Sequence, residues 1–159
     1  MRRFAEDTSV PVARSRAQID DLLRAWGCSG IAWIDDFDSG LVKLQFKWKR
    51  EQQLYLAQFD LRLPDDGQLR KRARHDRTGA FLETKFRNLC DARGRQEHRV
   101  LLLWLKAALN AVEAGIIDPA LIFLPFLVGR NGATFGAVAL PRLPQLLIGN
   151  ADRLLGTGE

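Results

Sequence analysis

Residues 41–49 read Leu41-Val-Lys-Leu-Gln-Phe-Lys-Trp-Lys49, and this stretch decides the fold of the chain. From Val42 onward its apolar and polar residues alternate strictly, and three of the polar positions are the lysines Lys43, Lys47 and Lys49. A period of two is typical of a β-strand with one face in the core and the other in water. The stretch therefore predicts a strand whose solvent face is cationic.

The segments on either side predict two further strands. Residues 30–37 form the first, followed by the turn residues Asp38-Ser39-Gly40, and residues 53–63 form the third. Residues 50–52 are expected to turn the chain from the second strand into the third. The result is a three-stranded antiparallel meander with one wet face, and helices are expected to cover the other face.

Helical patterns flank the predicted sheet. Ser15 and Gln18 have the spacing of a capping box, which predicts a helix from Ser15 to the glycine at position 27. A second helical pattern begins at residue 80, and Gly94 is expected to kink or end it. Residues 96–114 form the strongest helical pattern, apolar over more than half of the circumference, and are expected to lie at the centre of the core.

Shorter elements follow, and the whole chain reads as one α+β domain. Asp118-Pro119 predicts the start of a short helix to about residue 124, residues 126–128 are expected to be extended, and Thr134 is expected to cap a last helix. We expect a flexible arm at 1–14, a single domain at 15–148 with a basic linker at 68–79, and a frayed tail at 149–159.

The positive charge of the chain is concentrated in its middle. The net charge is +5, and residues 62–99 hold 11 Lys or Arg against 6 Asp or Glu, while the remaining residues hold 13 of each. A localised excess of this kind is typical of a protein that binds a polyanion. The alternative is a surface that only confers solubility, because net charge alone is a weak guide to partners.

Two groups of cations are the candidate nucleic-acid ligands. The first group lies in the predicted linker and comprises Arg70, Lys71, Arg72, Arg74 and Arg77. The second lies on or after the cationic strand and comprises Lys43, Lys47, Lys49 and Arg50. If the linker folds near that strand, all nine cations line one surface, and affinity would fall steeply with salt as counterions are released. Trp33 is the candidate for base stacking, because Phe46 and Trp48 alternate towards the core.

No motif amounts to an enzyme active site, and no cofactor or metal is implied. Asp65, Glu83 and Lys85 match a loose pattern of Mg²⁺-dependent nucleases, but the residues around Glu83 have helical rather than strand spacing. The cluster Asp35, Asp36 and Asp38 lacks the spacing of a calcium loop and is expected to form a hairpin turn.

The cysteines and histidines give no metal site either. Cys28, His75, Cys90 and His98 lack zinc-binding spacing, and His98 is expected on a helix surface. The cysteines are expected to be free thiols in a reducing cytoplasm. The N-terminus lacks the apolar run of a secretory signal, and residues 100–128 are too often interrupted by charges for a membrane span.

Three segments resemble a known family. They are Thr8-Ser9-Val10-Pro11-Val12 before Ser15-Arg16, the run Leu103-Trp-Leu-Lys-Ala-Ala-Leu-Asn-Ala-Val-Glu-Ala-Gly-Ile116, and Gly132-Ala133-Thr134 before an apolar helix. Together they resemble a family of uncharacterised phage and prophage proteins of similar length, over nearly the whole chain except the proline-broken segment 141–144. Members are often encoded beside phage recombination and replication genes, so the resemblance implies a role in DNA metabolism by association.

The sequence thus leaves three hypotheses. The first is a cytoplasmic, non-enzymatic phage accessory protein that binds DNA through a basic surface in recombination or replication. The second is an inhibitor or assembly factor that binds a host or phage protein, or a second copy of itself, through the apolar residues 116–128 if these are not all buried. The third, less favoured, is a Mg²⁺-dependent nuclease.

Overall fold

A three-stranded antiparallel sheet forms one layer of the computed structural model, which describes residues 5, 8–36, 38–62, 66–73 and 83–146. The strands are β1 (Gly30–Asp36), β2 (Leu41–Arg50) and β3 (Gln53–Arg62), in the order β1-β2-β3. In the register of the sheet, Phe46 lies opposite Ile31 on one side and Ala57 on the other. The meander predicted from the alternating pattern is confirmed.

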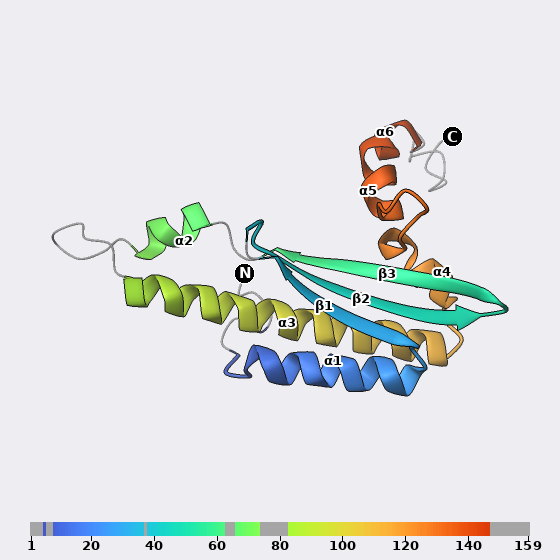
Figure 1. The fold of residues 1–159 in the computed structure, drawn as a ribbon, viewed down its shortest axis with the longest axis horizontal. Coiled ribbons are helices and arrows are strands. Elements are labelled where there is room, and N and C mark those ends of the chain that lie inside the picture. The colour runs from blue at the N-terminus through green and yellow to red at the C-terminus, as the bar shows by residue number, and fades with distance from the viewer. Residues whose placement is uncertain (1–4, 6–7, 37, 63–65, 74–82, 147–159) are drawn as a thin grey trace, which may run out of the picture.

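Two helices form the second layer, so the α+β architecture is confirmed. Helix α1 (Val12–Trp26) and the C-terminal half of α3 (Glu83–Glu113) lie side by side against the same face of the sheet (Figure 1). Apolar residues of β2 and β3, including Phe46 and Phe59, pack there against Ile19 and Leu23 of α1 and against Leu105 of α3. The opposite face of the sheet carries the lysines.

Helix α1 begins earlier than the predicted capping box. Its N-cap is Pro11, whose carbonyl oxygen accepts hydrogen bonds from the backbone N–H groups of Arg14 and Ser15. Ser15 therefore lies inside the first turns, fully buried, and its hydroxyl has no hydrogen-bond partner among the described residues. Proline suits this boundary because its φ angle is fixed and its missing N–H is not needed there. The expected end at Gly27 is confirmed by a left-handed φ of 101°.

Helix α3 runs without interruption through the glycine that was expected to kink or end it. The helix has 31 residues, and Gly94 is buried within it. An added Cβ at Gly94 would meet the Val12 side chain of α1 at 3.8 Å, so this is where the two helices approach each other. Neither α3 nor another helix in the described ranges is both long and apolar enough to cross a membrane.

The segment expected to be a basic linker begins with a helix instead. Helix α2 (Asp66–Ala73) packs against the N-terminal turns of α3, at the end of the molecule away from the β2–β3 turn (Figure 1). Leu69 and Ala73, spaced four apart on one side of the helix, are buried among the α2 residues whose burial is described. The remainder of the expected linker, residues 74–79, lies outside the described residues.

The C-terminal region continues from the edge of the sheet. It consists of α4 (Pro119–Ile122), η1 (Leu124–Phe126), α5 (Phe135–Ala139), η2 (Leu140–Arg142) and α6 (Leu143–Leu146). The predicted N-caps are confirmed, since Asp118 accepts a hydrogen bond from Ala120 N–H and Thr134 accepts one from Ala137 N–H. Between these helices the chain pairs with β3, because Val128 N–H donates to the Leu56 carbonyl oxygen.

Candidate nucleic-acid interface

The lysines of β2 lie on the exposed face of the sheet, as expected, but they have neighbours there. In the register, Lys43 lies opposite Asp60 on β3, and its charge helps to hold the pKa of Asp36 below its usual value, after the larger effect of hydrogen bonds from Ser39. The stem of Lys47 lies across Gly30, where an added Cβ would come within 2.6 Å of Lys47 Cε. These sheet-face lysines, Lys43, Lys47 and Lys49, therefore share their surface with carboxylates and with uncharged groups.

Arg50 is part of an ion pair within the protein. Its guanidinium donates to Oδ2 of Asp118, the N-cap residue of α4, and this bond lowers the pKa of Asp118 more than any other interaction does. The pair connects the β2–β3 turn to the C-terminal region across 68 positions of sequence. Arg50 is thus better explained as a structural contact than as a phosphate ligand.

Helix α2 presents its three cations to solvent. Arg70, Lys71 and Arg72 form its last turn and are exposed, and a cation near a helix C-terminus is stabilised by the helix dipole. The guanidinium of Arg70 lies over the ring of Phe86 on α3, 5.2 Å from its centroid. Of the predicted linker cations, Arg74 and Arg77 lie outside the described residues.

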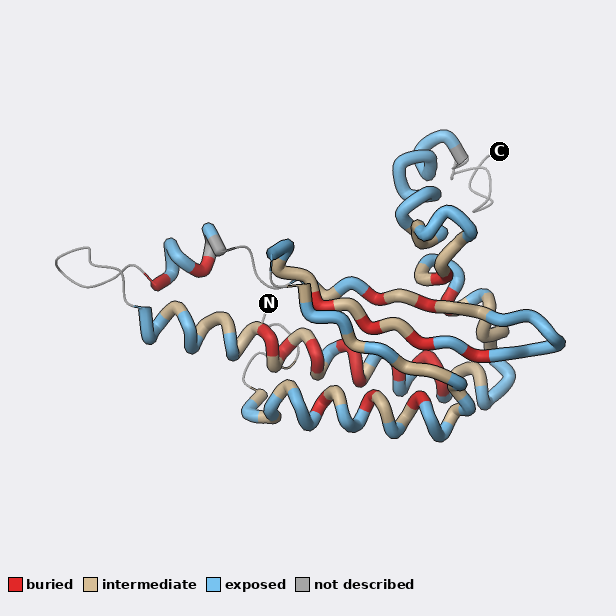
Figure 2. Tube along the Cα trace, in the orientation of Figure 1, coloured by how far each residue is buried: buried red, intermediate tan, exposed pale blue. Residues whose placement is uncertain are grey.

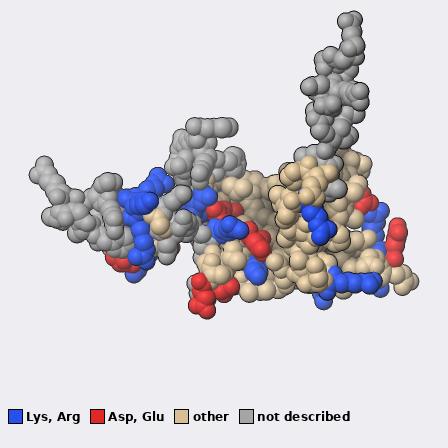
Figure 3. All heavy atoms as spheres, turned by 90° about the horizontal axis from the view of Figure 1, so that it is seen from above, with Lys and Arg blue, Asp and Glu red and all other residues tan. Residues whose placement is uncertain are grey.

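The N-terminal turns of α3 add exposed cations next to α2. Lys85 and Arg87 are exposed there, and Figure 3 shows Lys and Arg side chains gathered at the α2 end of the molecule. We call α2 and residues 83–95 of α3 the helical end, and its described residues include seven Lys or Arg against three Asp or Glu. Four of these cations are exposed and have neither an ion pair nor a hydrogen bond among the described residues; we call them the helical-end cations: Lys71, Arg72, Lys85 and Arg87.

The structure therefore separates some of the predicted ligands: Lys47, Lys49 and Arg50 lie in the half of β2 that leads to the β2–β3 turn, whereas Lys43 lies near the start of β2, at the end of the sheet towards α2 (Figure 1). Arg50 ends β2 at the β2–β3 turn, whereas α2 lies beyond the opposite end of the sheet (Figure 1). Lys85 and Arg87 were not among the predicted ligands. Their signal was in the sequence, because both lie in the positively charged segment 62–99.

Trp33, the predicted stacking residue, is covered by protein groups. It lies on the core side of β1, donates from its indole N–H to Asp20, and stacks on the ring of His98 with the centroids 5.6 Å apart. The guanidinium of Arg16 lies over the same indole, 4.7 Å from its centroid. Trp33 instead forms the base of a polar cluster between α1, β1 and α3 that sequence reasoning missed.

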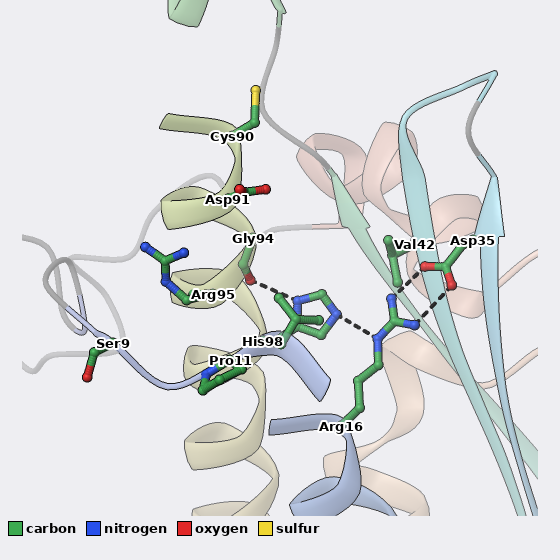
Figure 4. A pocket seen from close by; sticks show the side chains of 11 residues that line it. Ser9, Pro11, Arg16, Asp35, Val42, Cys90, Asp91, Gly94, Arg95 and His98 are labelled. Carbon is green, nitrogen blue, oxygen red and sulfur yellow. Dashed lines mark hydrogen bonds and ion pairs between the residues drawn. The ribbon is translucent and has the colours of Figure 1, made fainter. Parts of the chain in front are cut away.

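Arg16 is the centre of this cluster. It donates through both terminal nitrogens to the carboxylate of Asp35, at 2.9 and 2.5 Å, and through Nε to Nε2 of His98, at 3.1 Å (Figure 4). The bond from Arg16 lowers the pKa of Asp35. The pair anchors α1 to β1, so Asp35 is a structural partner rather than a turn residue.

His98 is buried, not on a helix surface as expected. Only 2% of it is exposed, and its other ring nitrogen, Nδ1, lies 2.8 Å from the Gly94 carbonyl oxygen. Because an arginine Nε–H can only donate, Nε2 of His98 must accept, and the proton lies on Nδ1. Burial, partly opposed by the Gly94 hydrogen bond, lowers the pKa of His98 and favours this neutral form.

A pocket of about 520 Å³ opens beside the cluster. Its wall is formed by α1, β1, β2, α3 and the segment before α1; Figure 4 draws the lining residues, among them Val12, Arg16, Asp35, Asp91 and Gly94. The volume lies within the range of about 300–1,000 Å³ that is typical of sites for small molecules. The pocket adjoins the helical end, because Asp91 and Gly94 belong to both.

The apolar segment 116–128 is partly buried. Phe123 and Leu127 belong to the core, whereas Leu121 and Leu124 are exposed, as are Phe135, Leu140 and other apolar residues of α5, η2 and α6. An exposed apolar surface of this kind is typical of a contact site for another protein.

Two of the three residues that match the nuclease pattern lie within the described part of the chain. Glu83 and Lys85 lie exposed in the first turn of α3, not on a core strand, and Asp65 lies outside the described residues. Within the described ranges, no three His, Cys, Asp or Glu side chains are grouped to hold a metal ion. Burial raises the pKa of the Cys28 thiol to about 12, so the thiolate form of Cys28 is disfavoured.

Comparisons with known proteins assign no family to this arrangement. The chain matches no protein-family model, no curated protein and no solved structure.

Proposed function

We propose that the protein binds DNA without an enzymatic step, through the exposed cations of its helical end. The observation that carries this proposal is the set of four helical-end cations, exposed and without ion-pair partners among the described residues. Lys and Arg side chains that are not compensated within the protein are the groups that phosphates attract, because each contact releases condensed counterions.

The distribution of charge over the whole chain supports the same surface. Residues 66–95 hold nine Lys or Arg and four Asp or Glu, so this segment accounts for the entire net charge of +5. Elsewhere the positive and negative charges balance, and some of them are paired within the fold, as in Arg50 with Asp118 and Arg16 with Asp35. We therefore assign the phosphate contacts to the helical end and not to the sheet-face lysines.

A role in phage recombination or replication is the biological setting that we propose. It is supported by the resemblance of three segments to phage and prophage proteins, and a binding surface that contacts phosphates without reading bases suits an accessory factor. The proposed contacts are made to phosphates, and we propose no helix that enters a DNA groove to contact base edges. The affinity for duplex DNA is therefore expected to depend little on its sequence.

The test is a salt titration of labelled single-stranded and duplex DNA, followed by fluorescence anisotropy. A variant of the helical end carries Lys71→Gln, Arg72→Gln, Lys85→Gln and Arg87→Gln, and the matched control carries Lys43→Gln, Lys47→Gln and Lys49→Gln. We expect the helical-end variant to bind more weakly, with a salt slope reduced by about 0.7–0.9 per lost phosphate contact. The sheet-face control should bind like the parent.

Two outcomes would reject this proposal. The first is no binding by the parent at about 50 mM salt, where phosphate contacts are strongest. The second is an equal loss of binding in both variants, which would mean that the helical end has no special role.

A protein-binding function is the second candidate, and the exposed apolar residues of the C-terminal region favour it. Four large apolar side chains of this region are each at least 43% exposed: Leu121, Leu124, Phe135 and Leu140. Exposed apolar side chains that gather in one region are typical of a contact site for another protein. This candidate predicts no DNA affinity, so the same titration separates it from the first.

A further inference from the structure

We infer that the pocket beside Arg16 takes an unpaired nucleobase, so that the protein prefers single-stranded DNA to duplex. This inference rests on the proposed function, because it concerns the same DNA. Its evidence is separate and comes from the cluster and the pocket rather than from the helical-end cations.

The pocket and the helical-end cations lie along one stripe of α3. Arg87, Asp91, Gly94 and His98 follow one another at spacings of four, three and four residues, which places them on one side of the helix. The last three of them line the pocket, and Arg87 lies one turn before it. A strand whose phosphates contact Arg87 therefore has the pocket within reach of a neighbouring base.

Arg16 offers that base a rigid planar surface. The edges of the Arg16 guanidinium donate hydrogen bonds to Asp35 and His98, and one of its faces lies against Trp33. Trp33 is not among the described residues that line the pocket. Arg16 nevertheless lines the pocket and keeps 23% of its side chain exposed. The face of the guanidinium opposite Trp33 has no ring or hydrogen-bond partner among the described residues, and guanidinium planes are surfaces on which unstacked bases stack.

The hydrogen bonds of Arg16 make this surface preorganised. A free arginine side chain must be ordered when it binds, whereas this guanidinium is already fixed by three hydrogen bonds and by the indole beneath it. The apolar walls Val12 and Val42 enclose the same space and suit the flat apolar faces of a base.

Asp91 supplies a means of selecting the base. Its carboxylate lines the pocket, is exposed, and has no partner among the described residues. A carboxylate accepts hydrogen bonds from exocyclic amino groups such as cytosine N4, and thymine has no such group. The pocket should therefore prefer a base that carries an amino group, and oligo-dC should bind more tightly than oligo-dT of equal length.

The test measures the affinity of the full chain for labelled oligo-dC, oligo-dT and a dC·dG duplex at one salt concentration. We expect the parent to bind oligo-dC about 5- to 10-fold more tightly than the duplex, as one stacked base would provide. Gly94→Leu places a bulky side chain in the wall of the pocket beside Val12 and should reduce this preference. Gly94→Ala is the matched control, since its Cβ meets Val12 at an ordinary contact distance of 3.8 Å and leaves the pocket open.

A second variant keeps the test valid if Gly94→Leu fails to fold. Asp91→Ala changes an exposed side chain and should bring the ratio of oligo-dC to oligo-dT affinity close to one. Failure of the proposed function appears as no binding to any of the three DNAs. Failure of this inference alone appears as binding in which single strands and duplex are equal, or in which the oligo-dC preference survives in Asp91→Ala.

Discussion

The body of the protein and its helical end differ in how much apolar surface they bury and in the charge that they carry. The body, formed by the sheet, α1 and the C-terminal half of α3, buries an apolar core that includes Ile19, Phe46 and Leu105, and most of the buried residues in Figure 2 lie in these elements. Among the described residues of the helical end, Leu69 and Ala73 of α2 and Gly94 of α3 are buried, and the helical end carries cations that the body does not neutralise. The difference teaches that the fold and the proposed binding surface draw on separate residues, so each can be changed with little effect on the other.

The largest effect is expected from removing buried volume in the two regions. Leu105→Ala leaves a cavity in the body and should lower the free energy of unfolding by about 2–5 kcal/mol. Leu69→Ala loosens α2 from α3 and should lower global stability much less, because the core does not depend on α2. Urea unfolding measures both changes.

The DNA affinity of the same two variants sharpens the comparison. Leu69→Ala should weaken binding because α2 is no longer held beside Lys85 and Arg87, whereas folded Leu105→Ala should bind like the parent. Equal losses of stability in the two variants would instead mean that the body and the helical end unfold as one unit. That result would contradict the view that they can be changed independently.

A smaller effect is expected from acid at the junction of the two regions. Burial lowers the pKa of His98, so the unfolded chain binds a proton more readily than the folded chain does. Stability should therefore fall as the pH drops below about 6.5, by no more than about 1.4 kcal/mol per pH unit. His98→Asn cannot take up this proton and should give a flatter profile between pH 5 and 7 in urea unfolding. A profile as steep as that of the parent would show that another group is responsible.

The smallest effect is expected from the ion pair between Arg50 and Asp118. The side chains of Arg50 and Asp118 are 46% and 37% exposed, so solvent screens the pair, and Arg50→Ala should lower the melting temperature only slightly and leave DNA affinity unchanged. The pKa of Asp118 is lowered in the fold, so the contribution of the pair is present above the ordinary carboxylate range and is lost as the pH falls through the lowered value. The melting temperatures of parent and variant should therefore converge in acid. A clear loss of DNA affinity in Arg50→Ala would instead show that Arg50 contributes to phosphate binding.

Periodicity predicted the body well because local pattern and tertiary burial agree there. The alternation around Phe46 and Trp48 specified β2, and Gly27, Asp118 and Thr134 marked helix boundaries through their own backbone or side-chain chemistry. The predictions failed where tertiary contacts override local signals. Ser15 and Gly94 have the local chemistry of a helix start and a helix end, but packing between α1 and α3 buries both of them inside helices.

The candidate site was predicted only in part. Charge counting found the segment that carries Arg70, Lys71 and Arg72, because net charge is a property of composition. It could not show that Lys47 and Arg50 lie at a distance from this segment, since that separation depends on where α2 packs. The cluster of Arg16, Asp35 and His98 joins positions up to 82 apart in sequence, and no local pattern indicates it.

The continuity of α3 fixes the angular relation between the two regions. A helix turns by about 100° per residue, so the direction in which Arg87 points relative to Gly94 is set by the number of residues between them. Inserting or deleting one residue in that interval would rotate the helical end about the axis of α3 and separate its cations from the pocket, while both regions kept their own contacts. The length of this interval, as well as its composition, is therefore a property on which selection can act.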